Sequence, residues 1–141
     1  MPRLVKIPES ISLALHSMAV LAERPDEIIT TKEIAGLLGG SSAHLAKVLK
    51  TLEHTGYVNS TRGPAGGFQI AGDPDEITLM DIYTAIEGPV ESGGCLLASS
   101  ICRGDACIFG EILQSLDSQF RDKLANTRLS ELTIPKEILS A

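Results

Sequence analysis

Three cysteines lie within thirteen residues and are the first candidates for chemistry in this chain. Six residues separate Cys95 from Cys102, and four separate Cys102 from Cys107. Three thiolates in one loop can bind zinc or an iron–sulfur cluster, and either needs a fourth ligand. They can instead act as a thiol redox switch, or pack as small apolar side chains beside neighbours such as Leu97 and Ile108. From the residues alone, all three interpretations stay open.

The remaining residues do not indicate an enzyme. The sequence has no glycine-rich nucleotide loop, no paired nucleophile and base, and no pair of carboxylates spaced for acid–base catalysis. A small metal- or thiol-dependent enzyme is therefore disfavoured. A second class of protein to consider is a dimeric module that binds a protein partner. Salt-dependent binding to duplex DNA would argue against such a module and for a protein that binds DNA.

The elements that would position these cysteines begin with a pair of short helices. Apolar residues at helical spacing predict a first helix over 9–22, with a stripe formed by Ile11, Leu15, Met18 and Leu21. A second helix begins after Thr30 or Thr31 and stops at glycines 39 and 40.

The third helix completes the motif. Ser41 or Ser42 caps it and Gly56 closes it, and the positions between them carry an apolar stripe. That stripe consists of Leu45, Val48, Leu49 and Leu52, and the side away from it is expected to expose Ala43, His44, Lys47 and Lys50. Two short helices joined by a glycine-containing turn form a helix-turn-helix, although an ordinary helical hairpin has the same pattern.

A β-hairpin is predicted directly after these helices. Residues 57–61 and 68–71 have the character of strands, and the turn between them has the sequence Arg-Gly-Pro-Ala-Gly-Gly. Arg62 lies where the first strand enters the turn, and its guanidinium could reach a phosphate or enter a minor groove. A helix-turn-helix followed by a basic hairpin is the winged-helix arrangement.

The second half of the chain predicts two more helices around the cysteines. Thr78 and Asp81 resemble a capping box at the start of a helix that ends near Gly88. A glycine- and serine-rich loop over 88–104 follows, and then a long helix over about 105–125. Its apolar side consists of Ile108, Ile112, Leu113, Leu116, Phe120 and Leu124. Because one small domain cannot cover this apolar side, we expect the chain to form a homodimer through this helix. The tail from Leu129 is expected to form a brief helical turn and then fray.

Charge and composition agree with this division. The net charge of −6 is unequally distributed: residues 1–70 carry seven lysines and arginines against six acids, and residues 71–141 carry five against twelve. The first half is therefore expected to face DNA. We find no signal peptide in the sequence, and the longest apolar stretch (11–22) is too short for a bilayer, so a cytoplasmic protein without membrane contact is expected.

These motifs resemble one family. The first helix (LALHSMAVLA), the segment from KEIAGLLGG to RGPAGGF, the segment DEITLMDIYTAIEG and the cysteine loop are similar to winged-helix regulators of the IscR and NsrR type. The resemblance implies a homodimer on a palindromic operator in double-stranded DNA. The positions it assigns to DNA are Ser41, Ser42, Ala43, His44, Lys47, Lys50, Arg62, Gly63 and Gly66.

The resemblance also implies a [2Fe–2S] or [4Fe–4S] cluster bound by Cys95, Cys102 and Cys107. Some members use a histidine three residues after the last cysteine, where this chain has Gly110. In other relatives the partner subunit's first helix completes the cluster, and His16 then becomes the expected fourth ligand, with Glu9 as a second candidate. The base-reading glutamate of IscR-type recognition helices falls on Ala46, so the operator is expected to differ.

The sequence therefore predicts a mainly helical protein of three parts: a winged helix-turn-helix (1–88), a cysteine-bearing sensor loop (89–104) and a dimerisation helix with its tail (105–141). It is expected to be a transcriptional repressor whose DNA affinity an iron–sulfur cluster controls. The alternative is a cluster-free regulator of the same fold, controlled by thiol oxidation or by a protein partner.

Overall fold

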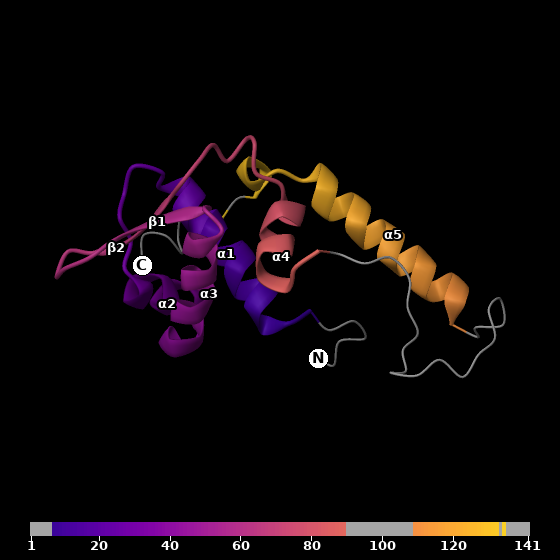
Figure 1. Ribbon diagram of the computed structural model, residues 1–141, viewed down its shortest axis with the longest axis horizontal. Helices are drawn as coiled ribbons and strands as arrows, with labels where there is room; N and C mark the ends of the chain where they lie inside the picture. Colours follow the sequence, from indigo (N-terminus) through magenta and orange to yellow (C-terminus); the bar gives the residue numbers. More distant parts are fainter. Residues whose placement is uncertain (1–6, 90–108, 133, 135–141) are drawn as a thin grey trace.

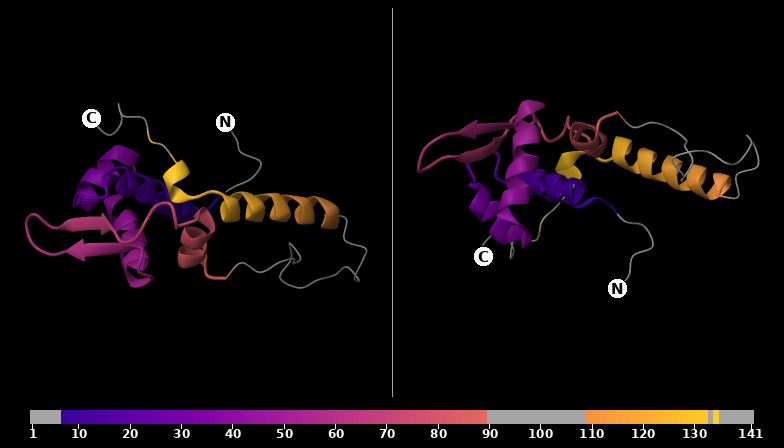
Figure 2. Two further views of the ribbon diagram at one scale, coloured as in Figure 1. Left: turned by 90° about the horizontal axis from the view of Figure 1, so that it is seen from above. Right: turned by 60° about the horizontal axis from the view of Figure 1, so that its bottom comes forward.

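The computed structural model describes residues 7–89, 109–132 and 134. Its elements are α1 (Glu9–Glu23), α2 (Thr31–Leu38), α3 (Ser42–His54), β1 (Val58–Thr61), β2 (Gly67–Ile70), α4 (Leu79–Glu87), α5 (Gly110–Asn126) and the 3-10 helix η2 (Leu129–Glu131). This part of the chain is mainly helical with one antiparallel hairpin, as the sequence predicts. The hairpin and α5 project from opposite ends of the molecule (Figure 1 and Figure 2).

Helix α1 is the centre of the core. It contacts α2, α3, α4, β2 and η2. The predicted stripe on this helix is too narrow, because Ala14 and Val20 are fully buried in addition to Ile11 and Met18. With so many elements packed around it, α1 buries several of its faces. Each large apolar side chain removed from water in this way contributes about 1.5–3 kcal/mol.

The predicted caps determine where α2 and α3 begin and end. Thr30 Oγ1 accepts a hydrogen bond from the Glu33 amide (3.1 Å), and Gly39 ends α2 in the left-handed conformation, with φ of 68°. Ser41 Oγ accepts a bond from the His44 amide (3.4 Å) at the start of α3. Capping satisfies amide groups that have no partner inside the helix. The helix-turn-helix is therefore confirmed.

The hairpin is attached to the helical body through its second strand. Strands β1 and β2 pair with Ser60 opposite Phe68, and Phe68 in turn exchanges two backbone hydrogen bonds of 2.8 Å with Ile29. A Cβ atom at Gly67 would lie 2.5 Å from the Ile29 carbonyl oxygen, so only glycine allows this approach. The sequence does not predict the contact with Ile29.

Helix α4 starts with the predicted capping box. Thr78 Oγ1 accepts a hydrogen bond from the Asp81 amide (3.1 Å), and the Asp81 carboxylate accepts one from the Thr78 amide (2.9 Å). Helix α4 packs against α1, α3 and α5. Tyr83 of α4 and Phe120 of α5 meet edge to face, with ring centroids 5.8 Å apart.

Helix α5 and the following residues differ in part from the prediction. Helix α5 begins at Gly110, and positions 105–108 of the predicted helix lie outside the described residues, as does most of the predicted sensor loop. The brief helical turn expected at Leu129 is confirmed by η2, and the fraying expected after it falls mainly outside the described residues. Leu129 is fully buried, and its amide donates to the Ile77 carbonyl oxygen (2.7 Å), which fastens this segment to the core. No helix among the described residues is long and apolar enough to cross a membrane.

Candidate nucleic-acid interface

Helix α3 presents one buried side and one polar side. Leu45, Val48, Leu49 and Leu52 are buried, as the stripe predicts. Ser41, Ser42, Ala43, Lys47 and Lys50 are exposed, and so is Ala46. In the helix-turn-helix arrangement this exposed side belongs to the helix that enters the major groove, and its lysines supply the positive charge that phosphates attract.

His44 is the exception among the predicted DNA-contacting residues of α3. Its side chain is half-buried, and its Nδ1 lies 3.5 Å from a carboxylate oxygen of Glu9, the first residue of α1. A carboxylate oxygen at this distance favours a proton on Nδ1, which leaves Nε2 as the ring nitrogen not engaged with Glu9. The two residues are far apart in the sequence, so sequence patterns gave no signal for this pair.

Two side-chain contacts hold the hairpin against the helices. Ser60 Oγ of β1 donates to the Glu53 carboxylate of α3 (2.7 Å), and Gln69 Nε2 of β2 donates to the Pro25 carbonyl oxygen (2.8 Å). One contact fixes each strand. Together with the Ile29–Phe68 backbone bonds, these contacts tie each strand of the wing to the rest of the body.

The turn of the hairpin carries Arg62, Gly63 and Gly66. Arg62 and Gly63 are exposed, and Gly63 has φ of 108°, which favours glycine. The Gly66 amide donates to the Gly63 carbonyl oxygen (2.9 Å), and a Cβ atom at Gly66 would lie 2.1 Å from the Thr61 carbonyl oxygen. Gly66 thus has a role inside the turn, and its contact with DNA stays a prediction.

Tyr57 lies at the junction between α3 and the hairpin. Burial raises the pKa of its phenol, and the nearby carboxylate of Asp81 raises this pKa further. The hydroxyl therefore stays neutral at physiological pH and adds no negative charge at the base of the wing.

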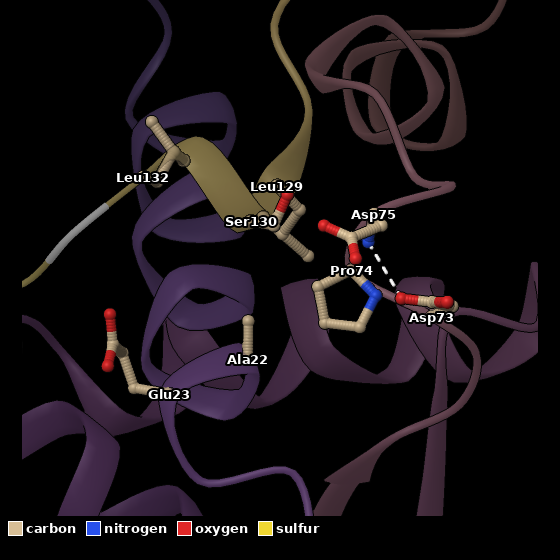
Figure 3. A pocket seen from close by; sticks show the side chains of 8 residues that line it. All are labelled: Ala22, Glu23, Asp73, Pro74, Asp75, Leu129, Ser130 and Leu132. Atoms are coloured by element: carbon tan, nitrogen blue, oxygen red, sulfur yellow. Dashed lines mark hydrogen bonds between the residues drawn. The ribbon is translucent and has the colours of Figure 1, made fainter.

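A hollow of about 290 Å³ lies away from this interface, between the end of α1, the loop after β2 and η2 (Figure 3). Its lining consists of Ala22, Glu23, Asp73, Pro74, Asp75, Leu129, Ser130 and Leu132. The Asp75 amide donates to the Asp73 carboxylate (2.9 Å). Three carboxylates in one hollow repel phosphate, so this part of the surface does not suit DNA.

The predicted metal ligands fall into two groups. Cys95, Cys102 and Cys107 lie outside the described residues. His16 is exposed on α1, and its Nδ1 donates to the Ser12 carbonyl oxygen (2.6 Å). This hydrogen bond fixes the tautomer in which Nε2 can coordinate a metal. Within the described ranges no group of three or more histidine, cysteine or acidic residues could hold a metal ion.

The family model Rrf2, described as an iron-dependent transcriptional regulator, matches residues 7–134. The chain belongs to the Rrf2 family. It is thus a transcriptional regulator and not an enzyme, as the sequence predicts. An HTH-type transcriptional regulator of Aquifex aeolicus is 33% identical over 127 residues, which cover 88% of each chain. The regulator IscR of Pectobacterium atrosepticum is 29% identical over 130 residues, covering 92% of this chain and 75% of the relative.

Solved structures of Rrf2-type regulators share the winged-helix fold. CymR, the global cysteine regulator of B. subtilis, matches with a TM-score of 0.73 and 26% identity, covering 91% of this chain and 95% of CymR. IscR of T. potens matches with a TM-score of 0.70 over 91% of this chain and 85% of that one. Its identity of 20% supports the fold alone.

Proposed function

We propose that this Rrf2-family regulator binds a palindromic operator as a homodimer and that an iron–sulfur cluster controls its affinity for DNA, most simply as a repressor in the cytoplasm. The observation that carries the cluster is the spacing of Cys95, Cys102 and Cys107, three thiols within thirteen residues between α4 and α5. His16 supports it, since the hydrogen bond at Nδ1 leaves Nε2 as the ligating nitrogen.

The dimer is proposed from the exposed apolar side of α5. Ile112, Leu116 and Phe120 follow one another at intervals of four residues, and they are 60%, 47% and 38% exposed. Such a side on a helix that projects from the body is suited to the same side of a second copy. Two-fold symmetry would place the two α3 helices about one DNA turn apart.

The predicted site fits a cluster in the nature of its donors. Three thiolates and a neutral imidazole are suitable ligands, and the cluster when bound supplies a group that responds to iron supply, redox state or nitric oxide. His16 of the second subunit would act as the fourth ligand, so that the ligand set would join the two subunits. A change at the site could then alter the spacing of the two helix-turn-helix units.

A thiol-controlled regulator without a cluster is the second candidate. The similarity to CymR favours it, since one CymR structure, from Staphylococcus aureus, is an oxidised form and matches this chain with a TM-score of 0.69 and 25% identity. The same three cysteines would then act through oxidation.

DNA binding is tested with Arg62→Ala. We expect the variant to bind a duplex selected by the wild type about ten- to hundredfold more weakly, because it loses the cation at the tip of the wing. Arg128→Ala, which removes an exposed cation outside both the helix-turn-helix and α5, is the control and should leave affinity unchanged. Equal affinity of Arg62→Ala and wild type over a range of salt concentrations would remove the wing from the interface.

The cluster is tested by anaerobic reconstitution of wild type, Cys102→Ala and His16→Ala. We expect the wild type to bind iron and sulfide with visible absorption, Cys102→Ala to lose both, and His16→Ala to show an altered spectrum. A full cluster in Cys102→Ala would contradict the cluster proposal. Wild type that binds no iron, but whose DNA affinity changes on oxidation, would establish the thiol-controlled alternative.

A further inference from the structure

A close contact between the Glu9 carboxylate and the His44 ring joins the start of α1 to the first turn of α3. Glu9 is the first residue of α1, directly after Pro8, and His44 is the third residue of α3. The carboxylate oxygen and Nδ1 lie 3.5 Å apart, and α1 and α3 pack against each other. The pair therefore spans two elements that the core already holds in place.

Stability of the fold does not explain this pair. The side chains of His44 and Glu9 are 37% and 68% exposed. Ion pairs at such exposure contribute little to folding, because water screens them and because both side chains lose conformational freedom. The position of His44 is more informative, since the N-terminal residues of a recognition helix are those that reach base edges.

The chemistry of the imidazole gives the pair a function. The Glu9 carboxylate, 3.5 Å from Nδ1, favours the ring orientation and the tautomer in which Nδ1 carries the proton. In the neutral ring with this tautomer, Nε2 is a hydrogen-bond acceptor for the amino group of adenine or cytosine in the major groove. Without the carboxylate, the ring can rotate and exchange the proton between its two nitrogens.

We propose that Glu9 is a positioning residue for DNA recognition: it holds His44 in the tautomer and orientation that read a base. This inference rests on the proposed DNA-binding function and assigns a role to a residue outside the recognition helix. For the loss of Glu9, it predicts a change in DNA affinity opposite in sign to the change that charge repulsion alone predicts. Removing an acid near DNA reduces repulsion and should strengthen binding, whereas removing a positioning residue should weaken specific binding.

The experiment compares Glu9→Gln, His44→Ala and the double variant on a duplex that the wild type selects from a random-sequence library. Glu33→Gln is the control, because Glu33 is an exposed acid in the first turn of α2. We expect Glu9→Gln to bind the selected duplex about fivefold more weakly with an unchanged salt dependence, and Glu33→Gln to bind equally or more tightly. In the His44→Ala background, Glu9→Gln should have no further effect.

A second readout examines the free protein. The ¹⁵N chemical shifts of the His44 ring should report the Nδ1–H tautomer in wild type and a mixture in Glu9→Gln, with unchanged iron content and thermal stability. The proposal is overturned if Glu9→Gln binds as tightly as wild type, if it weakens binding equally without His44, or if it loses iron and so acts as a ligand. A wild type that selects no duplex would overturn the DNA-binding function itself, which separates the two failures.

Discussion

The winged-helix body buries most of its apolar residues, whereas α5 leaves most of its apolar residues exposed. In the body, α2, α3 and α4 each begin with a side-chain cap, and the inner side of α3 is buried. Helix α5 has no side-chain hydrogen bond at its N-cap, Phe109, and Leu124 is the one residue of this helix that is buried. Most apolar residues of the body are thus buried within one chain, with Ile7 and Ile28 as exposed exceptions.

Attachment to the rest of the chain shows the same difference. Helix α4 contacts α1, α3 and α5, whereas α5 is held mainly near its C-terminal end, where Phe120 meets Tyr83 and Leu124 enters the core. The remainder of α5 projects outward in Figure 1. From this contrast we infer that the body is stable within one chain, and that the exposed side of α5 requires a second surface.

The largest expected effect is on self-association, and it comes from placing a charge on the exposed apolar side of α5. Leu116→Glu should convert the proposed dimer to a monomer at micromolar concentration. Burial of one leucine contributes about 1.5–3 kcal/mol, and a two-fold interface loses both copies, about 3–6 kcal/mol in total. Gln114→Glu adds the same charge at an exposed position off the apolar side and should stay dimeric. Sedimentation that shows a dimer for Leu116→Glu would disprove the role assigned to α5.

The second prediction concerns the core of the body. Leu49→Ala should lower the free energy of unfolding by about 2–5 kcal/mol, because Leu49 is fully buried and its truncation leaves a cavity. Lys50→Ala, at the adjacent exposed position, should change this free energy by less than about 0.5 kcal/mol. Urea unfolding is measured in the Leu116→Glu background, so that dimerisation does not contribute. Equal stability of Leu49→Ala and its parent would contradict a self-sufficient body.

Local signals in the sequence predicted the body well. Thr30, Ser41 and Thr78 cap the helices that their positions indicate, because capping depends on residues three apart. The stripe of α3 and the hairpin followed from periodicity and turn residues. These features depend on residues that are close together in the sequence, and sequence patterns contain that information.

Contacts between distant segments were not predictable in this way. The bridge from Ile29 to Phe68, the Glu9–His44 pair and the anchoring of Leu129 each join residues more than thirty positions apart. Helical or strand periodicity does not indicate such pairs, so the anchoring of Leu129 was not predicted and the single stripe predicted on α1 was too narrow. For the site, sequence patterns placed the exposed residues of α3 correctly, but not the half-buried ring of His44.

The smallest effect tests α4, the helix of the body on which α5 packs. Thr78→Ala should lower the free energy of unfolding by about 1 kcal/mol, because it removes the hydroxyl that accepts the Asp81 amide proton at the start of α4. Thr78→Ser retains a hydroxyl and should lower the free energy of unfolding much less.

Hydrogen exchange of the α5 amides provides a sharper test, since α4 is the element on which α5 packs. If Thr78→Ala speeds exchange in α4 and near Leu124 but not in α3, the body tolerates a loosened α4 while the attachment of α5 weakens. Uniformly faster exchange would instead mean that body and α5 unfold as one unit, and the division between them would have no energetic basis.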